Sequence, residues 1–232
     1  PETIYYLNAI DIVFGMKEQE HFISMNSDFG NAYLQGRFNM PAVLQNLKNT
    51  IISKLPGIQT LLPVKYEKIP DVNIKLTAEI NNAEWMEKLL DIPVQLHKPL
   101  RLAGSMNSKR QYTDVTLRVP DMVYNSSRYA NGLFHITTSG DTLKTIARVR
   151  KYDAKRHPSD WYIRGAAVND NLITSLSFNN RSRNRRLKGQ LNAETKFFKN
   201  ANNESAAHIT VHPSEILVGD TTWHVQPSDM IY

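Results

Sequence analysis

Four short strings with a glycine between two apolar residues recur along the chain, at 34–38, 102–106, 163–167 and 187–191. In a β-strand, residues i, i+2 and i+4 lie on one face of the sheet, so each string places its glycine between two apolar side chains on that face. A glycine inside a strand removes side-chain volume and marks a bend, a bulge or a close approach. The strings therefore indicate a sheet built by repetition, with an apolar face that is locally hollowed.

The rest of the chain alternates in the same way. The clearest segment covers 72–80, where apolar and polar residues alternate without interruption, and from residue 100 onward short alternating segments follow one another with polar turns between them. This pattern is typical of antiparallel β-structure. We predict a mainly β fold: a repetitive, curved antiparallel sheet in the form of an open trough, with two short amphipathic helices.

The two helices are expected at 40–55 and shortly after residue 82. The first carries six apolar residues at helical spacing from Val43 to Leu55, and Pro56-Gly57 ends it. The second has Trp85, Met86 and the pair at 89–90 on its apolar side. We expect the first helix to cover a core, with a partner-binding helix as the alternative.

The chain divides at its proline-containing irregular stretch. We expect a β-meander with a capping helix over 1–56, a linker over 57–70, and a repetitive antiparallel β region over 71–232. The first and last regions can also form one continuous unit. The start of the chain reads as strand rather than as a signal peptide, so we interpret the sequence as a piece of a longer protein.

Composition excludes several classes. No apolar run approaches the roughly 20 residues of a transmembrane helix, and cysteine is absent, which excludes disulfides and thiol nucleophiles. The net charge of +6 arises largely from one stretch, since removing its five cations leaves +1. These cations are Arg181, Arg183, Arg185, Arg186 and Lys188. We interpret the stretch as a solvated hairpin loop, with an anionic partner such as lipid headgroups as the alternative, and predict no nucleic-acid binding.

Chemistry-bearing patterns are sparse. The chain has no Gly-x-Ser-x-Gly string and no phosphate-binding glycine loop. His208 and His212 can share one face of a strand, but a metal site usually needs a third ligand. We therefore predict no metal, no cofactor and no enzymatic activity. Two alternatives stay open: a carbohydrate-binding or adhesin-like β-sandwich lined by tryptophans such as Trp161, and a hydrolase whose residues converge only in three dimensions.

Several stretches, taken in order, resemble a known family. They cover 27–55, 100–104, 167–172, 187–191 and 211–227. Together they are similar to the central, AsmA-like region of the TamB family of bacterial translocation and assembly module proteins, in the long form found in Bacteroidetes-type bacteria. The resemblance covers nearly the whole chain, although none of its stretches carries a reactive residue.

This resemblance implies a function in the cell envelope. Members of the family are anchored in the inner membrane by an upstream helix, cross the periplasm, and curl a repeated sheet into a trough with an apolar inner face. They support outer-membrane biogenesis by phospholipid transfer and, in some cases, with a BamA-related outer-membrane protein. This chain would be one periplasmic segment, with the membrane anchor outside it. The helix over 40–55 departs from the pure β-trough of the family.

The residues allow a physical version of the same hypothesis. Leaving an apolar environment costs an acyl chain about 0.8 kcal/mol per exposed methylene, and an apolar strand face would remove much of that cost. We predict a groove for phospholipid acyl chains whose floor is formed by Val72, Ile74, Leu76, Ile80, Val115, Leu117, Leu133 and Leu143. The alternative is that these eight residues form an ordinary sealed core. The expected role is non-enzymatic, in phospholipid transfer or in support of outer-membrane protein assembly.

Overall fold

The fold was analysed in a computed structural model of the 232-residue chain. The structure describes residues 9–60, 65–85, 91–153, 155–181, 186–202 and 205–231. The expected second helix falls mostly on 86–90, and two arginines of the cationic stretch, Arg183 and Arg185, fall on 182–185. Both segments lie outside the described residues.

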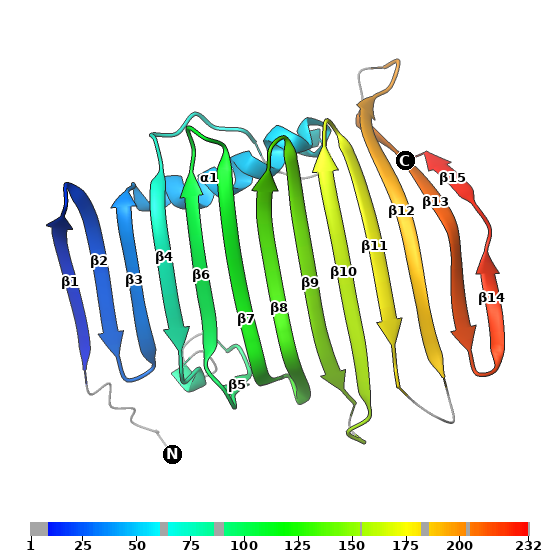
Figure 1. Cartoon of the computed structure of the whole chain (residues 1–232), viewed down its shortest axis with the longest axis horizontal. Helices are drawn as coiled ribbons and strands as arrows, with labels where there is room; N and C mark the ends of the chain where they lie inside the picture. Colours follow the sequence, from blue (N-terminus) through cyan, green and yellow to red (C-terminus); the bar gives the residue numbers. More distant parts are fainter. Residues whose placement is uncertain are drawn as a thin grey trace.

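The described strands form one antiparallel sheet (Figure 1). In chain order they are β1 Ile10–Lys17, β2 Glu20–Ser27, β3 Gly30–Arg37, β4 Asn73–Ile80, β5 Val94–Leu96, β6 Leu100–Asn107, β7 Tyr112–Tyr124, β8 Ser127–Ser139, β9 Thr142–Tyr152, β10 Pro158–Val168, β11 Asn171–Asn179, β12 Leu187–Lys199, β13 Ser205–Val218, β14 Thr221–Val225 and β15 Ser228–Ile231.

Neighbours in the sheet are almost always neighbours in the sequence. The order runs β1-β2-β3-β4-β6 and then without interruption to β14, while β5 pairs with β7 and β15 with β13. The sheet is open, because its two ends do not meet. These observations confirm the mainly β, open antiparallel fold. Since β3 pairs directly with β4, the strands before and after the helix belong to the same sheet.

Tight turns explain this up-and-down order. Three two-residue connections, at Glu18-Gln19, Asn125-Ser126 and Asn169-Asp170, have positive φ at both residues. That geometry matches the right-handed twist of the flanking strands, and Asn and Asp adopt it more readily than other non-glycine residues. The polar turns therefore return each strand directly beside its predecessor.

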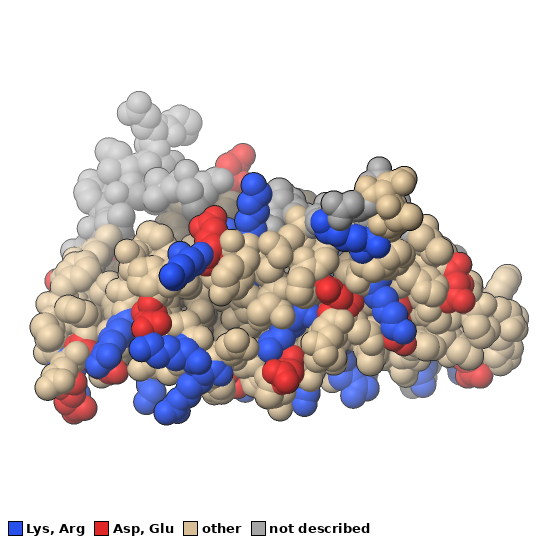
Figure 2. Space-filling view, turned by 90° about the horizontal axis from the view of Figure 1, so that it is seen from above, with Lys and Arg blue, Asp and Glu red and all other residues tan. Residues whose placement is uncertain are grey.

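The two faces of the sheet differ in polarity. Alternation sends the even-numbered residues of β4, for example Ile74 and Leu76, to one face, and Asn73 and Lys75 to the other. We call these the apolar face and the polar face. Figure 2 shows Lys and Arg side chains projecting along one long side of the molecule. Arg101, Arg118 and Arg148 are exposed cations whose strand positions place them on the polar face.

The α-helix α1, Met40–Lys54, and the 3-10 helix η1, Pro56–Thr60, lie wholly within the described residues, and Glu84 and Trp85, at the start of the expected second helix, are also helical. The helix α1 leaves the end of β3, and η1 follows it. Figure 1 shows α1 crossing the sheet transversely, near one end of the strands. In the described part of the chain, no helix is both long and apolar enough to cross a bilayer.

The described part of the expected linker packs against α1. The Asn49 side chain donates a hydrogen bond to the backbone oxygen of Glu67 over 2.7 Å, and Ile69 packs against a cluster that contains Val72 and Ile74. These contacts lie on the side of α1 that faces the strand ends. The segment is therefore held against the helix over the residues that the structure describes.

Candidate functional site

The apolar face is organised in rows that run across the strands. Because residues directly opposite each other in an antiparallel sheet share a face, the register defines each row. One row carries no polar residue from β1 to β12, and we call it the open row. Its members are Ile12, Met25, Ala32, Ala78, Leu102, Leu117, Phe134, Ala147, Ile163, Leu176 and Leu191.

Two further rows lie between the open row and the strand ends under α1. We call them the covered rows. The one nearer the strand ends contains Gly36, Ile74, Met106, Thr113, Thr138, Leu143, Ala167 and Leu172. The other contains Leu34, Leu76, Gly104, Val115, Ile136, Thr145, Gly165 and Thr174. Unlike the open row, both covered rows include threonines.

The helix α1 packs on the covered rows with its polar and apolar sides in a defined orientation. Asn46 donates a weak 3.7 Å hydrogen bond to the Met106 sulfur, and the hydroxyls of Thr50 and Thr113 lie 3.3 Å apart. Leu47 and Ile51 pack against a buried cluster that includes Ile136 from one covered row and Leu143 from the other. The polar side of α1 therefore faces the strand ends, and its apolar side faces the open row.

The same side of α1 also presents Leu44. This residue precedes Leu47 and Ile51 by three and seven positions, which places all three on one side of the helix. Leu44 is 69% exposed although it is large and apolar. The apolar side of α1 and the open row together form an apolar step, with the sheet as its floor and the helix as its wall.

The open row is accessible over much of its length. None of its members is buried, and Phe134 and Ile163 are each 43% exposed. The next row toward the far strand ends contains Trp161 and Phe178, whose rings lie 5.7 Å apart, and also Trp223. A chain that folds around a single core would instead place its most apolar row under the helix.

The glycine strings lie on the apolar face, but they do not leave the hollows that we predicted. A Cβ atom added at Gly189 would lie 2.8 Å from the Phe178 ring, and one added at Gly165 would lie 2.6 Å from the Thr145 hydroxyl. Neighbouring side chains already occupy these spaces. At Gly36 the backbone has a φ of +136°, and the nearest atom is the Asn73 carbonyl oxygen, so the glycine there permits a close backbone approach.

Seven of the eight residues predicted for the groove floor lie in two groups. Val72, Ile74 and Leu143 are buried in clusters with or beneath α1, where they form part of a sealed core. The other four on the apolar face, Leu76, Ile80, Val115 and Leu117, are half-buried.

The assignment of Leu133 to the groove floor was wrong. It lies opposite Arg118 and Arg148, on the polar face, so it does not belong to the predicted floor. The odd-numbered positions of this segment are Leu133, His135 and Thr137, whereas Phe134 and Ile136 alternate with them on the apolar face. The alternation of those two residues with His135 was the signal that could have identified the correct face.

The cationic stretch is tied to the polar face at its described ends. Arg181 forms an ion pair with Asp160, which also accepts a 2.6 Å hydrogen bond from Arg150 Nε. The hydrogen bond from Arg150 is the main cause that lowers the pKa of Asp160; burial opposes it, and Arg181 adds to it. Arg186 accepts a backbone hydrogen bond from Gly219, and Lys188 lies in β12.

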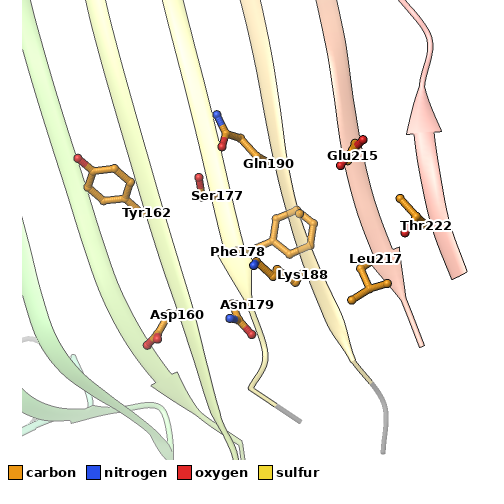
Figure 3. Close-up of a pocket in the computed structure, with 11 residues that line it drawn as sticks. Asp160, Tyr162, Ser177, Phe178, Asn179, Lys188, Gln190, Glu215, Leu217 and Thr222 are labelled. Carbon is orange, nitrogen blue, oxygen red and sulfur yellow. The ribbon is translucent and has the colours of Figure 1, made fainter. Parts of the chain in front are cut away.

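A polar-face depression of about 440 Å³ lies beside Asp160 (Figure 3). Its other lining residues include Tyr162, Ser177, Lys188 and Glu215, which come from four different strands. Lys188 is therefore the one described member of the cationic stretch that lines this depression. The depression is separated from the open row by the sheet itself.

Histidines pair with carboxylates rather than with one another. His208 lies 3.4 Å from Asp229, and His212 lies 3.9 Å from Glu194. Within the described ranges, no group of three or more histidine and carboxylate side chains is arranged to hold a metal ion. The feature that distinguishes this molecule chemically is thus the exposed apolar row.

The site was compared with known proteins through sequence and structure. No protein-family model matches the chain, and neither a curated protein nor a solved structure matches it. The candidate site consequently rests on its own geometry: an apolar row that crosses the sheet from β1 to β12, beside the apolar side of one transverse helix.

Proposed function

We propose that the chain is a non-enzymatic segment of a TamB-like envelope protein, and that its open row shelters phospholipid acyl chains during their transfer between the inner and outer membranes. The observation that carries the proposal is the reversal of the usual order of burial. The row without polar residues has no buried member, whereas the covered row nearer the strand ends, which contains Thr113 and Thr138, is almost entirely buried.

The dimensions of the open row suit an acyl chain. Adjacent strands lie roughly 4.8 Å apart, so the row from β1 to β12 is about 48 Å long, which exceeds the roughly 30 Å hydrocarbon thickness of a bilayer. An extended chain could lie along it, across the strands, with the apolar side of α1 beside it. Such sheltering requires neither a nucleophile nor a metal.

The proposal includes a location and a partner. We propose that the segment works in the periplasm, as part of a protein anchored elsewhere in the inner membrane, and that a BamA-related outer-membrane protein cooperates with it. The alternative β-sandwich loses its architectural basis, because the described strands form one sheet rather than two packed sheets. No observation favours the hydrolase alternative over lipid sheltering.

Two isoleucines provide a matched test. Ile163 in the open row is 43% exposed, and Ile173 on the polar face of the neighbouring strand is 54% exposed. We expect lipid extraction and native mass spectrometry of the wild-type chain, purified without detergent, to detect bound phospholipid. Ile163→Glu should lose most of this lipid, because a carboxylate would interrupt the apolar row, whereas Ile173→Glu should retain it.

Two results would count against the proposal. One is a wild-type chain that carries no phospholipid and does not accept a fluorescent phospholipid from vesicles. The other is an equal loss of lipid in both variants, which would show that the apolar row is not the binding surface. Circular dichroism of both variants would establish that each still folds.

A further inference from the structure

Positive charge is in excess on the strands from β6 to β11, which lie in the interior of the sheet, away from both of its ends. These strands carry eight Lys and Arg residues but three acidic residues. Each acid already has a partner: Asp114 lies 3.3 Å from His135, Asp121 pairs with Arg128, and Asp160 pairs with Arg150. No acid of these strands therefore remains to balance their other cations.

Arg118 and Arg148 are two of the cations that lack a counter-ion. They lie in one cross-strand row of the polar face, on either side of Leu133, and both are exposed. Among the described residues, neither side chain forms an ion pair or a hydrogen bond. Arg118 also lies opposite Arg101, and like charges directly opposite destabilise a strand pair. An anion bound beside this row would reduce that repulsion.

A β-bulge lies next to the two arginines, and a depression of about 500 Å³ lies beside it. The pairing of β8 with β9 shifts between Ala130 and Leu133, where Asn131 has a φ of 54°. Both arginines line the depression, together with Asn131 and Tyr162. Bulges often re-aim side chains next to functional sites. Here the bulge interrupts the regular strand surface at the point where the two guanidinium groups border one space.

The one acid that lines this depression is already neutralised. Asp160 accepts hydrogen bonds from Arg150 over 2.6 and 3.2 Å, one at each carboxylate oxygen. Its carboxylate also pairs with Arg181. Arg150 is thus engaged with Asp160, whereas Arg118 and Arg148 keep their hydrogen-bond donors for a ligand. The depression therefore carries a net positive charge.

We propose that this depression binds the phosphoryl group of a soluble anion, held between Arg118 and Arg148. The two arginines flank β8, so their backbones lie about 10 Å apart, and their long side chains can reach one anion from both sides. Each guanidinium group donates two parallel hydrogen bonds to an oxyanion. A phosphoryl group offers three acceptor oxygens to these donors, whereas a carboxylate offers two. Asn131 and Tyr162 supply further donors from the same lining.

The position of the depression favours a soluble phosphate over the headgroup of a sheltered lipid. Arg118 and Arg148 lie on the polar face, so the sheet separates them from the open row. A phospholipid whose acyl chains lie on the open row would place its headgroup on the other side of the sheet. Phosphate binding here neither requires nor tests the proposed sheltering of acyl chains.

Isothermal titration calorimetry with inorganic phosphate, at constant ionic strength, tests the site. We expect saturable binding of one phosphate to the wild-type chain. Arg118→Gln and Arg148→Gln should each weaken it about tenfold or more, because each removes a charged donor pair. Arg37→Gln is the matched control, since Arg37 is an exposed arginine on the polar face of β3, outside the depression. It should retain wild-type affinity.

Three outcomes would overturn the proposal. The first is a wild-type chain that shows no saturable binding of inorganic phosphate. The second is the same affinity in all three variants, whether retained or lost, which would show that the overall positive charge rather than the depression attracts phosphate. The third is binding to vesicles that contain phosphatidic acid without binding to inorganic phosphate, which would make a membrane surface the anionic partner. Circular dichroism would establish that each variant still folds.

Discussion

The covered and open parts of the apolar face come from the same strands but differ in environment. In the covered rows, Ile74, Ile136 and Leu143 are each less than 5% exposed, beneath α1. In the open row, Phe134 and Ile163 are each more than 40% exposed. The strand pattern alone does not distinguish the open row from the covered rows, since all three alternate in the same way. The difference arises from where one helix lies.

The polarity of the two parts runs against their burial. The covered row nearer the strand ends contains hydroxyls that are paired: the backbone N–H of Thr113 donates to the Thr138 hydroxyl over 2.9 Å, and the Thr113 hydroxyl lies near that of Thr50. Buried polar groups need such partners, so the covered row nearer the strand ends is adapted to burial. The open row has no polar side chain that needs a hydrogen-bond partner, so an apolar ligand could exclude water from it at no such cost. The most apolar row of the sheet is thus the one in which no residue is buried.

The largest predicted effect is a difference in stability between the same substitution at a covered isoleucine and at an open-row isoleucine. Ile136→Ala removes a buried side chain beneath α1 and should lower the free energy of unfolding by about 3 kcal/mol, through lost burial and a cavity. Ile163→Ala, an identical change in the open row, should cost less than about 1 kcal/mol, because no layer covers that side chain. Urea unfolding followed by tryptophan fluorescence measures both.

Equal losses in the two variants would contradict this assignment. Such a result would mean that the open row is covered by another part of the protein in solution. Hydrogen exchange would then show where the additional layer lies, because amides in the halves of β9 to β11 remote from α1 would be protected as strongly as those beneath α1.

The second prediction removes a contact that holds α1 in place. The Gly57 N–H donates a 2.6 Å hydrogen bond to Asp170 Oδ1, and the Asp170 N–H donates to the Lys54 carbonyl oxygen over 3.0 Å. Asp170→Ala removes the first bond and places Ala at a φ of 60°. We expect a loss of about 1–3 kcal/mol and increased binding of a hydrophobic dye, as the covered rows become accessible.

Asp170→Asn is the matched control for this contact. It keeps a side-chain oxygen that can accept from Gly57 N–H, and Asn tolerates a positive φ. It should therefore retain most of the stability and bind little dye. A similar increase in dye binding for Asn and Ala would mean that the negative charge, rather than the hydrogen bond, holds the end of α1.

The strand content of the molecule could be predicted from the sequence, and the arrangement of its layers could not. Alternation over 72–80 and beyond residue 100 predicts an antiparallel sheet, and polar pairs such as Asn169-Asp170 predict its turns. These signals are local. The position of α1 over Thr113 and Leu143 depends on contacts between residues far apart in the sequence, which no local pattern records.

The candidate site shows the same limit at single residues. The correct face was predicted for Leu117 and Ile74, but whether each is accessible depends on α1. Leu133 was assigned to the wrong face because its apolar character was given more weight than its phase relative to Phe134. The glycines were read as hollows, whereas Phe178 and Thr145 lie over Gly189 and Gly165. A glycine in one strand leaves space that the neighbouring strand fills.

The open part of the sheet has cross-strand ion pairs on its polar face where it lacks a second layer. Arg150 and Asp160 lie opposite each other on β9 and β10, and Arg181 joins the same carboxylate from the end of β11. Farther along the sheet, Asp121 accepts hydrogen bonds from Arg128, which is the main cause that lowers its pKa. These pairs connect neighbouring strands at the ends remote from α1.

The smallest predicted effect is the acid sensitivity of this open part. The pKa of Asp160 is lowered from 3.8 in the folded chain, chiefly by the Arg150 hydrogen bond, so its contribution to stability is complete above that value and is lost as the pH falls through the folded pKa. Because the pair is partly exposed, Asp160→Asn should cost under about 1 kcal/mol near pH 7. Between about pH 5 and about pH 2 the variant should lose less stability than the wild-type chain. Thermal unfolding across that range measures the difference, with Asp220→Asn, a change at an exposed turn, as the control. If both variants follow the wild-type curve, the ion pair does not stabilise the open part, and strand hydrogen bonding alone must hold β9 and β10 together there.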